Sequence, residues 1–253
     1  MCAATRSESG LILEARDVVR SFGGLRAVDG LSFRIDAGEL VGLIGPNGSG
    51  KTTLANLICG ALPLTSGDII FRGKSIRGLK DHQVARLGIA RTFQVTRPFT
   101  RLTVQANVAV GAMFSGPYLG RDEAFARADE TLARVGLAGK ARHSGAQLTV
   151  ADRKRLELAR ALVQNPTLLI LDEAMAGLNL HEIDVVIDLV REINRQGVTI
   201  IVVEHVMKVI MVLCQRVIVL HHGRKLAEGS PAEIAADDGV IREYLGARYL
   251  RSQ

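Results

Sequence analysis

Short apolar stretches separated by pairs of small residues open the chain. Two glycines follow the first stretch at residues 23–24, and an alanine and a glycine follow the second at residues 37–38. Such punctuation is typical of hairpin-like connections between strands. We therefore predict three strands joined by hairpins, at Leu11–Phe22, 27–35 and Leu40–Ile44.

Helical patterns dominate the next part of the chain. A helix is predicted over residues 51–62, where a proline follows, and a turn with one further strand is predicted for residues 66–76. Residues 80–145 carry little strand signal. They contain helical patterns at 104–113 and 121–135, and the second pattern places a row of apolar side chains on one face. This region is expected to be a mainly helical insert.

Helices and strands alternate in the second half of the chain. Helices are predicted at 151–163 and 181–196, and wholly apolar strands at 167–171 and 198–203. A Ser-Pro-Ala-Glu sequence at 230–233 predicts the start of a last helix. Strands without a polar position are typical of the middle of a parallel sheet that helices cover on both faces. The chain is therefore predicted to be an α/β protein.

Composition limits the classes of protein that fit this pattern. The 253 residues are 47% hydrophobic and 23% charged, which suits one large α/β domain with a substantial core. The formal net charge of +6 is spread along the chain, and aromatic residues make up only 4%. No basic run is interleaved with aromatic residues, so a nucleic-acid partner is not expected.

Membrane spans, a secretory signal and disulfides are not expected either. The longest uncharged run, residues 102–120, contains amides, a proline and three glycines, and is too polar for a membrane span. The first ten residues lack the apolar segment of a secretory signal. Three cysteines do not make a disulfide framework in a chain of this length. A cytoplasmic protein is expected.

A glycine-rich loop follows the predicted strand Leu40–Ile44 and opens the next helix. Glycines let consecutive backbone N–H groups curve around a phosphate, and a helix N-terminus adds positive potential. In such loops a lysine bridges the β- and γ-phosphates, and the next hydroxyl ligates Mg²⁺. A mere glycine-rich turn is the alternative, which the flanking strand and helix disfavour. The residues expected to bind ATP here are Gly45, Asn47, Gly48, Ser49, Gly50, Lys51, Thr52 and Thr53, with Thr52 also on Mg²⁺.

Two adjacent acids end the apolar strand predicted at 167–171. The carboxyl ends of parallel strands form the ligand-binding edge of an α/β sheet. Asp172 is expected to hold Mg²⁺, and Glu173 to orient or deprotonate the attacking water. Alone, two acids at a strand end are more often a solvated turn. Together with the loop at Lys51 they predict a site that hydrolyses a nucleotide.

With these motifs in this order, the chain resembles the ATP-binding cassette (ABC) ATPases over nearly its whole length. The family's order is also followed by Phe22, Gln94, the segment 148–152, an Ala-Gly-Leu-Asn sequence at 176–179, and His205. The resemblance implies that ATP and Mg²⁺ are the ligands of this chain.

The resemblance also implies how the chain is divided. A single ABC ATPase domain is expected over residues 1–253. Its P-loop NTPase core, with an N-terminal antiparallel β subdomain, is expected at about 1–95 and 160–253. A helical subdomain is expected at about 96–160, inserted into this core.

Three of these residues take roles from the resemblance alone. Phe22 would stack on adenine, Gln94 would touch both Mg²⁺ and the transmembrane partner, and His205 would contact the γ-phosphate in catalysis. Each has a plainer alternative: a core aromatic for Phe22, a solvated strand end for Gln94, and a satisfied histidine for His205. Their joint occurrence in the family's order favours the functional interpretation.

One segment departs from the family's pattern. Members usually carry Leu-Ser-Gly-Gly-Gln at the start of a helix that contacts the ATP of the second subunit. Thr149 keeps a hydroxyl that can bond a phosphate and cap the helix. A positive φ at Ala151 would cost about 1 kcal/mol. Asp152 is expected to bring a carboxylate toward the γ-phosphate, with cations at 153–155 as compensation, so weakened hydrolysis is one expectation. The segment in this chain is Leu148, Thr149, Val150, Ala151 and Asp152.

Finer details resemble the ATPases of branched-chain amino acid importers. They include the sequences Arg-Thr-Phe-Gln at 91–94, Arg-Pro-Phe at 97–99, Val-Glu-His-Val-Met at 203–207 and Val-Ile-Arg-Glu-Tyr-Leu-Gly at 240–246. The implied protein is an ATP-hydrolysing subunit on the inner face of the cell membrane. It would pair with a second ABC ATPase, identical or homologous, and with separate transmembrane permease subunits. A lipopolysaccharide-export ATPase and a degenerate ATP-binding partner with little hydrolysis are the alternatives.

Overall fold

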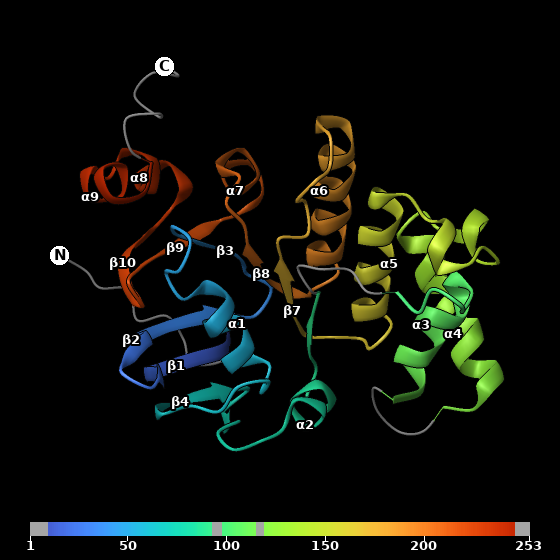
Figure 1. The fold of residues 1–253 in the computed structure, drawn as a ribbon, viewed down its shortest axis with the longest axis horizontal. Coiled ribbons are helices and arrows are strands. Elements are labelled where there is room, and N and C mark those ends of the chain that lie inside the picture. The colour runs from blue at the N-terminus through green and yellow to red at the C-terminus, as the bar shows by residue number, and fades with distance from the viewer. Residues whose placement is uncertain (1–9, 93–97, 115–118, 246–253) are drawn as a thin grey trace.

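The chain folds into two β-sheets and a set of helices (Figure 1). The computed structural model describes residues 10–92, 98–114 and 119–245. The smaller sheet is antiparallel, with strand order β2-β1-β4-β5, and the larger has the order β10-β9-β3-β8-β7-β6. The strands are β1 Leu11–Phe22, β2 Leu25–Asp36, β3 Leu40–Ile44, β4 Ser66–Phe71, β5 Lys74–Ser75, β6 Ile89–Arg91, β7 Leu168–Asp172, β8 Thr199–Val203, β9 Arg216–His221 and β10 Arg224–Gly229. The helices are α1 Lys51–Ile58, α2 Asp81–Arg86, α3 Val104–Phe114, α4 Arg121–Arg134, α5 Val150–Leu162, α6 Leu180–Arg195, α7 Met207–Leu213, α8 Pro231–Ala236 and α9 Asp238–Val240.

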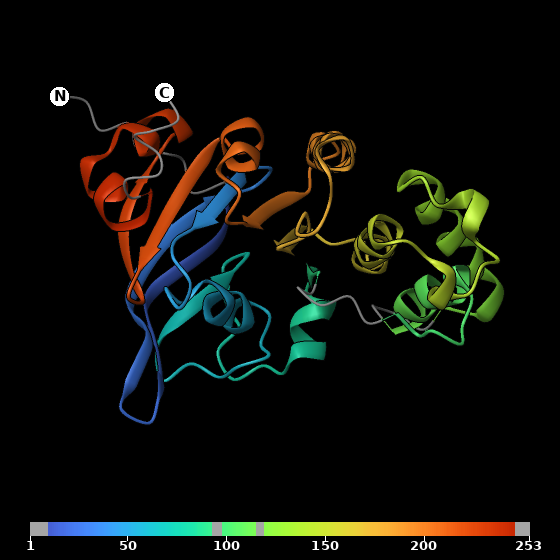
Figure 2. The same ribbon diagram turned by 45° about the horizontal axis from the view of Figure 1, so that its top comes forward.

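The central strands of the larger sheet are buried along their whole length. Every residue of β3, β7 and β8 is buried, and β8 runs parallel to both β3 and β7. Alternate residues of β7 point to opposite faces of the sheet. Leu169 and Leu171 pack with α5 and α6, whereas Leu168 and Ile170 pack with α1 and the smaller sheet. Figure 2 shows α6 and α7 on one side of these strands and α1 on the other. Two-sided burial explains why the strand sequences carry no alternating polar positions.

The third predicted strand belongs to a different sheet from the first two. β1 and β2 form the expected antiparallel hairpin. β3, however, runs parallel to β8 and β9 in the larger sheet, so its connection from β2 is a crossing between sheets rather than a hairpin. The pair Ala37-Gly38 marks a turn in either case. The sequence pattern predicts the strands correctly but does not determine their partners.

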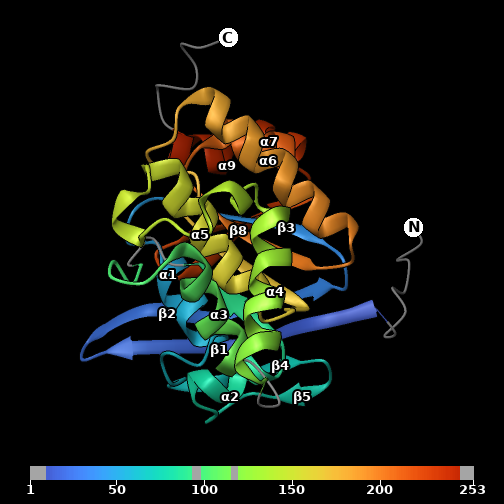
Figure 3. The same ribbon diagram turned by 90° about the vertical axis from the view of Figure 1, so that its right-hand side faces the viewer.

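Small side chains let α3 and α4 pack closely together. Four alanines from these two helices are buried in the core, and α5 joins the same cluster. In Figure 1 this helical group lies at the right, beyond α5 and away from the smaller sheet, and Figure 3 shows it from its outer side. The buried alanines are Ala109 and Ala112 of α3 and Ala124 and Ala128 of α4.

Several elements differ from the sequence-based expectations. α1 ends at Ile58 rather than near residue 62, because Gly60 adopts a left-handed φ of 70° just after the C-cap. β6 is only three residues long, and β10 is half charged and mostly exposed, so neither gives an apolar run. α7 and β9 were not predicted either. The start of α8 is as predicted, with the Ser230 side chain accepting from Glu233 N.

None of the helices in the described ranges has both the length and the apolar character that crossing a bilayer requires.

Candidate functional site

The glycine-rich loop between β3 and α1 follows a path that only glycine allows at two points. Gly45 has a φ of 149° and Gly50 a φ of 104°. A Cβ at Gly45 would lie 2.1 Å from the carbonyl oxygen of Leu220 in β9. One at Gly50 would lie 2.4 Å from the carbonyl oxygen of Ala27 in β2. The loop is therefore packed closely against both β9 and β2.

The other loop residues combine exposed groups with one buried hydroxyl. Asn47, Gly48 and Thr52 are exposed and Thr53 is half-buried, so the Thr52 hydroxyl is available to a hard cation. Ser49 is only 2% exposed, and its Oγ has no hydrogen-bond partner. An orphaned buried hydroxyl is unfavourable, and a phosphate oxygen in the loop would supply the missing partner. The residues of this loop therefore fit a phosphate ligand.

Lys51, the first residue of α1, folds its side chain back over the loop. Its Nζ donates to the carbonyl oxygens of Gly45 at 2.8 Å and Pro46 at 3.0 Å. Burial lowers the pKa of Lys51, while the negative charges of Glu173 and Asp172 act in the opposite direction. Both carboxylates lie close enough to influence the ammonium group, which brings the loop and the acidic pair into one site.

Asp172, at the end of β7, forms a buried ion pair that the sequence did not suggest. Nη2 of Arg91 lies 2.5 Å from Oδ2 of Asp172, and Nη1 of the same arginine lies 2.5 Å from Oδ1 of Asn56 in α1. The hydroxyl of Thr92 accepts from the backbone N of Asp172 at 3.2 Å. Arg91 thus links β6, α1 and the carboxylate expected to hold Mg²⁺. A charged residue ending a short strand was the one available signal.

Glu173 occupies a strained backbone position directly after Asp172. Its φ is 48°, in the left-handed region that costs a non-glycine residue about 1 kcal/mol. Two hydrogen bonds hold it there: its N donates to the carbonyl of Val203 at 2.9 Å, and Nζ of Lys154 donates to its carbonyl at 2.9 Å. Its side chain is half-buried. Strain maintained by surrounding contacts is typical of functional positions.

His205 follows the end of β8, and its side chain is exposed. Its neighbour Glu204 is 1% exposed and points the other way, accepting from the backbone N of Met175 at 3.0 Å. The second carboxylate oxygen of Glu204 is buried without a hydrogen-bond partner, and burial raises the pKa of this carboxyl. The hydrogen bond between Glu204 and Met175 therefore joins the loop after Glu173 to the segment that carries His205. The sequence analysis did not identify Glu204.

Phe22 ends β1 as an exposed aromatic. Its ring is 45% exposed, and the guanidinium carbon of Arg20 lies 4.6 Å from the ring centroid. The alternative of a core aromatic is therefore wrong. Gln94 lies outside the described residues, so its expected contact with Mg²⁺ stays a prediction.

The segment that departs from the family's pattern begins α5. Thr149 is its N-cap, and the Thr149 side chain accepts from Asp152 N at 3.2 Å. Leu148 is buried and Val150 is 56% exposed. Ala151 lies inside the helix, not in the left-handed region, so the expected strain at this position is absent from the described structure.

The Asp152 carboxylate does not extend outward from the helix. It is buried and paired with Nζ of Lys140 at 2.5 Å, and it accepts from Oγ1 of Thr149 at 2.8 Å. Of the cations at 153–155 that were expected to compensate, Lys154 donates to the carbonyl of Glu173 and Arg153 to that of Ala146, and their effect on a bound phosphate stays a prediction. The counter-charge comes from the connection between α4 and α5.

The phosphate loop and the start of α5 lie in different parts of the chain's fold. Figures 1 and 2 show α1 and α5 on opposite sides of β7 and β8. The structure therefore brings together the loop, Lys51, Asp172 and Glu173, but does not bring the segment 148–152 onto them.

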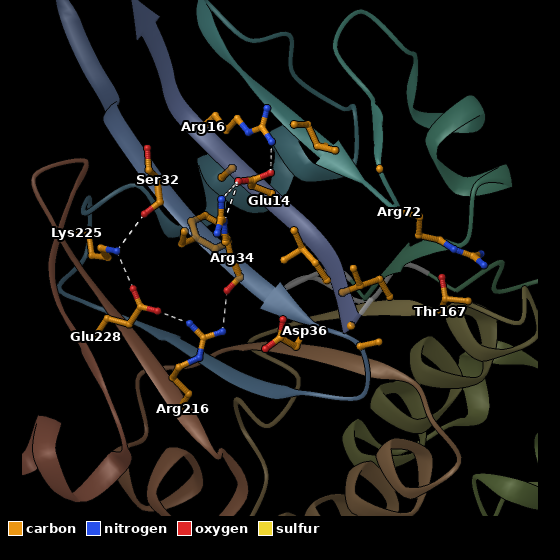
Figure 4. Close-up of a pocket in the computed structure, with 18 of the residues that line it drawn as sticks. Glu14, Arg16, Ser32, Arg34, Asp36, Arg72, Thr167, Arg216, Lys225 and Glu228 are labelled. Atoms are coloured by element: carbon orange, nitrogen blue, oxygen red, sulfur yellow. Dashed lines mark hydrogen bonds and ion pairs between the residues drawn. The ribbon is translucent and has the colours of Figure 1, made fainter. Parts of the chain in front are cut away.

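A large groove elsewhere in the fold is separate from the phosphate loop. It has a volume of about 1350 Å³ and lies between strands β1 and β2 of the smaller sheet and strands β9 and β10 of the larger one (Figure 4). Six of its charged side chains pair with one another: Arg16 and Arg34 with Glu14, and Arg216 and Lys225 with Glu228. None of the loop residues 45–51 lines it.

Comparison with known proteins identifies relatives that cover nearly the whole chain. The sequence model described as "ABC transporter" matches residues 28–176. The "High-affinity branched-chain amino acid transport ATP-binding protein LivG" of Salmonella typhimurium is 40% identical, over 93% of this chain and 98% of its own. The "Lipopolysaccharide export system ATP-binding protein LptB" of Escherichia coli is 31% identical, over 92% of this chain and 97% of its own.

Solved structures agree with the fold. The ADP conformation of MJ1267, "an ATP-binding cassette of an ABC transporter", superimposes with a TM-score of 0.86 at 28% identity, over 93% of this chain and 99% of that one. A "dimeric structure of a post-hydrolysis state of the ATP-binding cassette MJ0796 bound to ADP and Pi" gives a TM-score of 0.79 at 26% identity, over 87% and 99%. These similarities confirm the predicted α/β fold class of a P-loop NTPase.

Proposed function

Because the chain belongs to the ABC transporter family and is an ATPase of that family, we propose that it powers the import of branched-chain or related amino acids through separate membrane subunits. The observation that carries this proposal is the 40% identity to LivG over 98% of that protein's length. The lipopolysaccharide-export alternative rests on 31% identity to LptB.

In the proposed mechanism, the phosphate loop binds and orients the triphosphate of ATP. Backbone N–H groups of the loop, the Ser49 hydroxyl and Lys51 take up phosphate oxygens. To do so, Lys51 exchanges its carbonyl partners Gly45 and Pro46 for the β- and γ-phosphates. Phe22 offers its exposed face to the adenine ring.

Hydrolysis then depends on the two acids after β7. Thr52, Asp172 and Gln94 would hold Mg²⁺, which neutralises charge on the phosphates when bound. The half-buried Glu173 accepts a proton from the attacking water or orients it, and the strained backbone fixes its direction. His205 is exposed at the end of the adjacent strand, where it can donate to the γ-phosphate.

A second ATPase subunit, identical or homologous, would complete each site. The exposed Thr149 and Val150 at the start of α5 lie apart from the phosphate loop of their own chain. Two chains arranged head to tail would place this segment on the ATP of the partner. A solved cassette of the same fold is a dimer bound to ADP and phosphate, which supports the pairing of two such chains.

Membrane subunits would dock on the helical part of the chain, and the family resemblance assigns Gln94 to this contact. Two large apolar side chains there are open to solvent: Phe99 is 46% exposed and Phe114 is 73% exposed. Aromatic side chains are enriched in protein–protein interfaces, so these two are candidates for the contact. Closing and opening of the two ATPase subunits would be passed to the membrane subunits through this surface.

The proposal is tested by uptake and by partner capture in the source cells. Cells that lack this chain should lose most high-affinity uptake of labelled leucine, isoleucine and valine, and the wild-type gene, but not its Lys51→Ala variant, should restore it. A tagged chain should capture polytopic membrane proteins from detergent extracts. Normal amino acid uptake together with a defect in lipopolysaccharide export would favour the alternative. Full ATPase activity without any captured membrane protein would contradict both.

A further inference from the structure

The Asp152 carboxylate lies in a closed set of polar contacts at the start of α5. Oδ2 of Asp152 accepts from Nζ of Lys140 at 2.5 Å and from Oγ1 of Thr149 at 2.8 Å. Oγ1 of Thr149 in turn accepts from the backbone N of Asp152 at 3.2 Å. The Thr149 hydroxyl therefore donates its hydrogen to the Asp152 carboxylate, and Lys140 holds that carboxylate in place.

This carboxylate is ionised although it is buried. The Asp152 side chain is 8% exposed, whereas that of Lys140 is 44% exposed and reaches in from the short helix Ala138–Lys140. Burial alone would raise the pKa of Asp152, but the hydrogen bonds from Lys140 and Thr149 outweigh it, and the pKa lies below its ordinary value. Lys140 and Asp152 thus form a nearly neutral unit.

An unpaired carboxylate at this place would oppose phosphate binding. The backbone N–H groups at a helix start attract anions, and a carboxylate beside them competes with and repels a phosphate. Two of the three cations that follow Asp152 have other contacts: Lys154 donates to the carbonyl of Glu173 and Arg153 to the carbonyl of Ala146. Lys140 is the cation that contacts Asp152 among the described residues.

We propose that Lys140 is a positioning residue for ATP hydrolysis, which neutralises Asp152 and fixes Thr149 so that the start of α5 accepts the γ-phosphate bound by the second subunit. This inference rests on the proposed head-to-tail pairing of subunits. It explains how the chain tolerates an acid where the family pattern has glutamine. Lys140 would act in trans, on the ATP of the partner, and not on the ATP bound by its own loop.

The test uses ATP-driven dimerisation of the full chain in a Glu173→Gln background, where bound ATP is not consumed. Lys140→Met should raise the protein concentration needed for half-maximal dimerisation at least tenfold, measured by analytical ultracentrifugation with Mg·ATP. Binding of a fluorescent ATP analogue to the monomer should change less than twofold, because the phosphate loop is untouched. A general loss of folding would reduce both.

Three further variants separate charge from packing. Lys140→Arg keeps the ion pair and should dimerise like the parent. Lys140→Met combined with Asp152→Gln removes both charges and should recover most of the lost dimerisation. Arg142→Met removes one cation from the same connection, at an exposed position that is not bonded to Asp152, and should have no effect.

The outcomes distinguish this inference from the function on which it rests. A parent that stays monomeric with Mg·ATP refutes head-to-tail pairing of two identical chains and, with it, the role of Lys140 in that pair. A parent that dimerises while Lys140→Met dimerises equally well refutes the role of Lys140 alone. A double variant as defective as Lys140→Met shows that packing around Lys140 matters rather than its charge, and also overturns the inference.

Discussion

Replacing Arg91 with methionine tests the ion pair in the centre of the site. Both side chains of this pair are nearly inaccessible, with 7% of Arg91 and 2% of Asp172 exposed. The arginine also donates to Asn56 at 2.5 Å. Methionine has similar length and fills the apolar space, but it leaves Asp172 as a buried carboxylate without its closest counter-charge.

The expected loss is large for one substitution. Leaving one member of a buried ion pair unpaired costs about 3–5 kcal/mol. In a protein of this size 1 kcal/mol corresponds to roughly 2–4 °C in Tm, so Tm should fall by about 6–20 °C. Arg91→Lys keeps the charge but cannot reach both partners in a fork, so its loss should be about 1–2 kcal/mol.

The assay is calorimetric unfolding without nucleotide, as a double-mutant cycle with Asp172→Asn. The double variant should be more stable than Arg91→Met alone, because the orphaned charge is gone. Mg·ATP should recover part of the loss in Arg91→Met but not in the double variant, since Asp172 is expected to face Mg²⁺. A Tm for Arg91→Met within about 2 °C of the wild type would refute the reasoning. So would a double variant no more stable than the single one.

Two further predictions concern a helix start and a buried acid. Ala151→Gly should lower the free energy of unfolding by about 1 kcal/mol, because Ala151 has a helical backbone, and should not raise the ATPase rate; faster hydrolysis would show that the position needs a glycine. Burial raises the pKa of Glu204 above its ordinary value of 4.5, so the folded state favours the protonated carboxyl. The stability that this protonation contributes is therefore lost as the pH rises from 4.5 through the raised pKa. Glu204→Gln keeps an acceptor for Met175 N and should be more stable than the wild type at pH 7, but not below pH 4.5, in urea unfolding at both pH values. Equal curves at pH 7 would contradict the burial argument.

Much of the fold follows from local patterns in the sequence. The buried strands β3, β7 and β8 carry continuous apolar runs because helices or the other sheet cover both their faces. Strand partners do not follow in the same way. β3 joins β8 and β9 across long stretches of chain, and no local pattern records that pairing.

The candidate site was predictable where backbone chemistry dictates the residues. The phosphate loop needs glycine at Gly45 and Gly50, and the sequence shows it. Arg91 and Lys140 were missed for a different reason: each pairs with a carboxylate in another segment of the chain, and the sequence around the cation does not identify that partner. The prediction that the Asp152 carboxylate points outward was wrong for the same reason, because its counter-charge, Lys140, comes from another segment.

The most direct test of the whole account is steady-state ATP hydrolysis by the purified chain with Mg²⁺, measured over a range of protein concentrations. Turnover per molecule should rise steeply with concentration, as composite sites between two chains require. Glu173→Gln should slow hydrolysis by about two to four orders of magnitude while ATP binding persists, whereas Lys51→Ala should lose binding itself. Turnover that is independent of concentration, or unchanged in Glu173→Gln, would contradict the account.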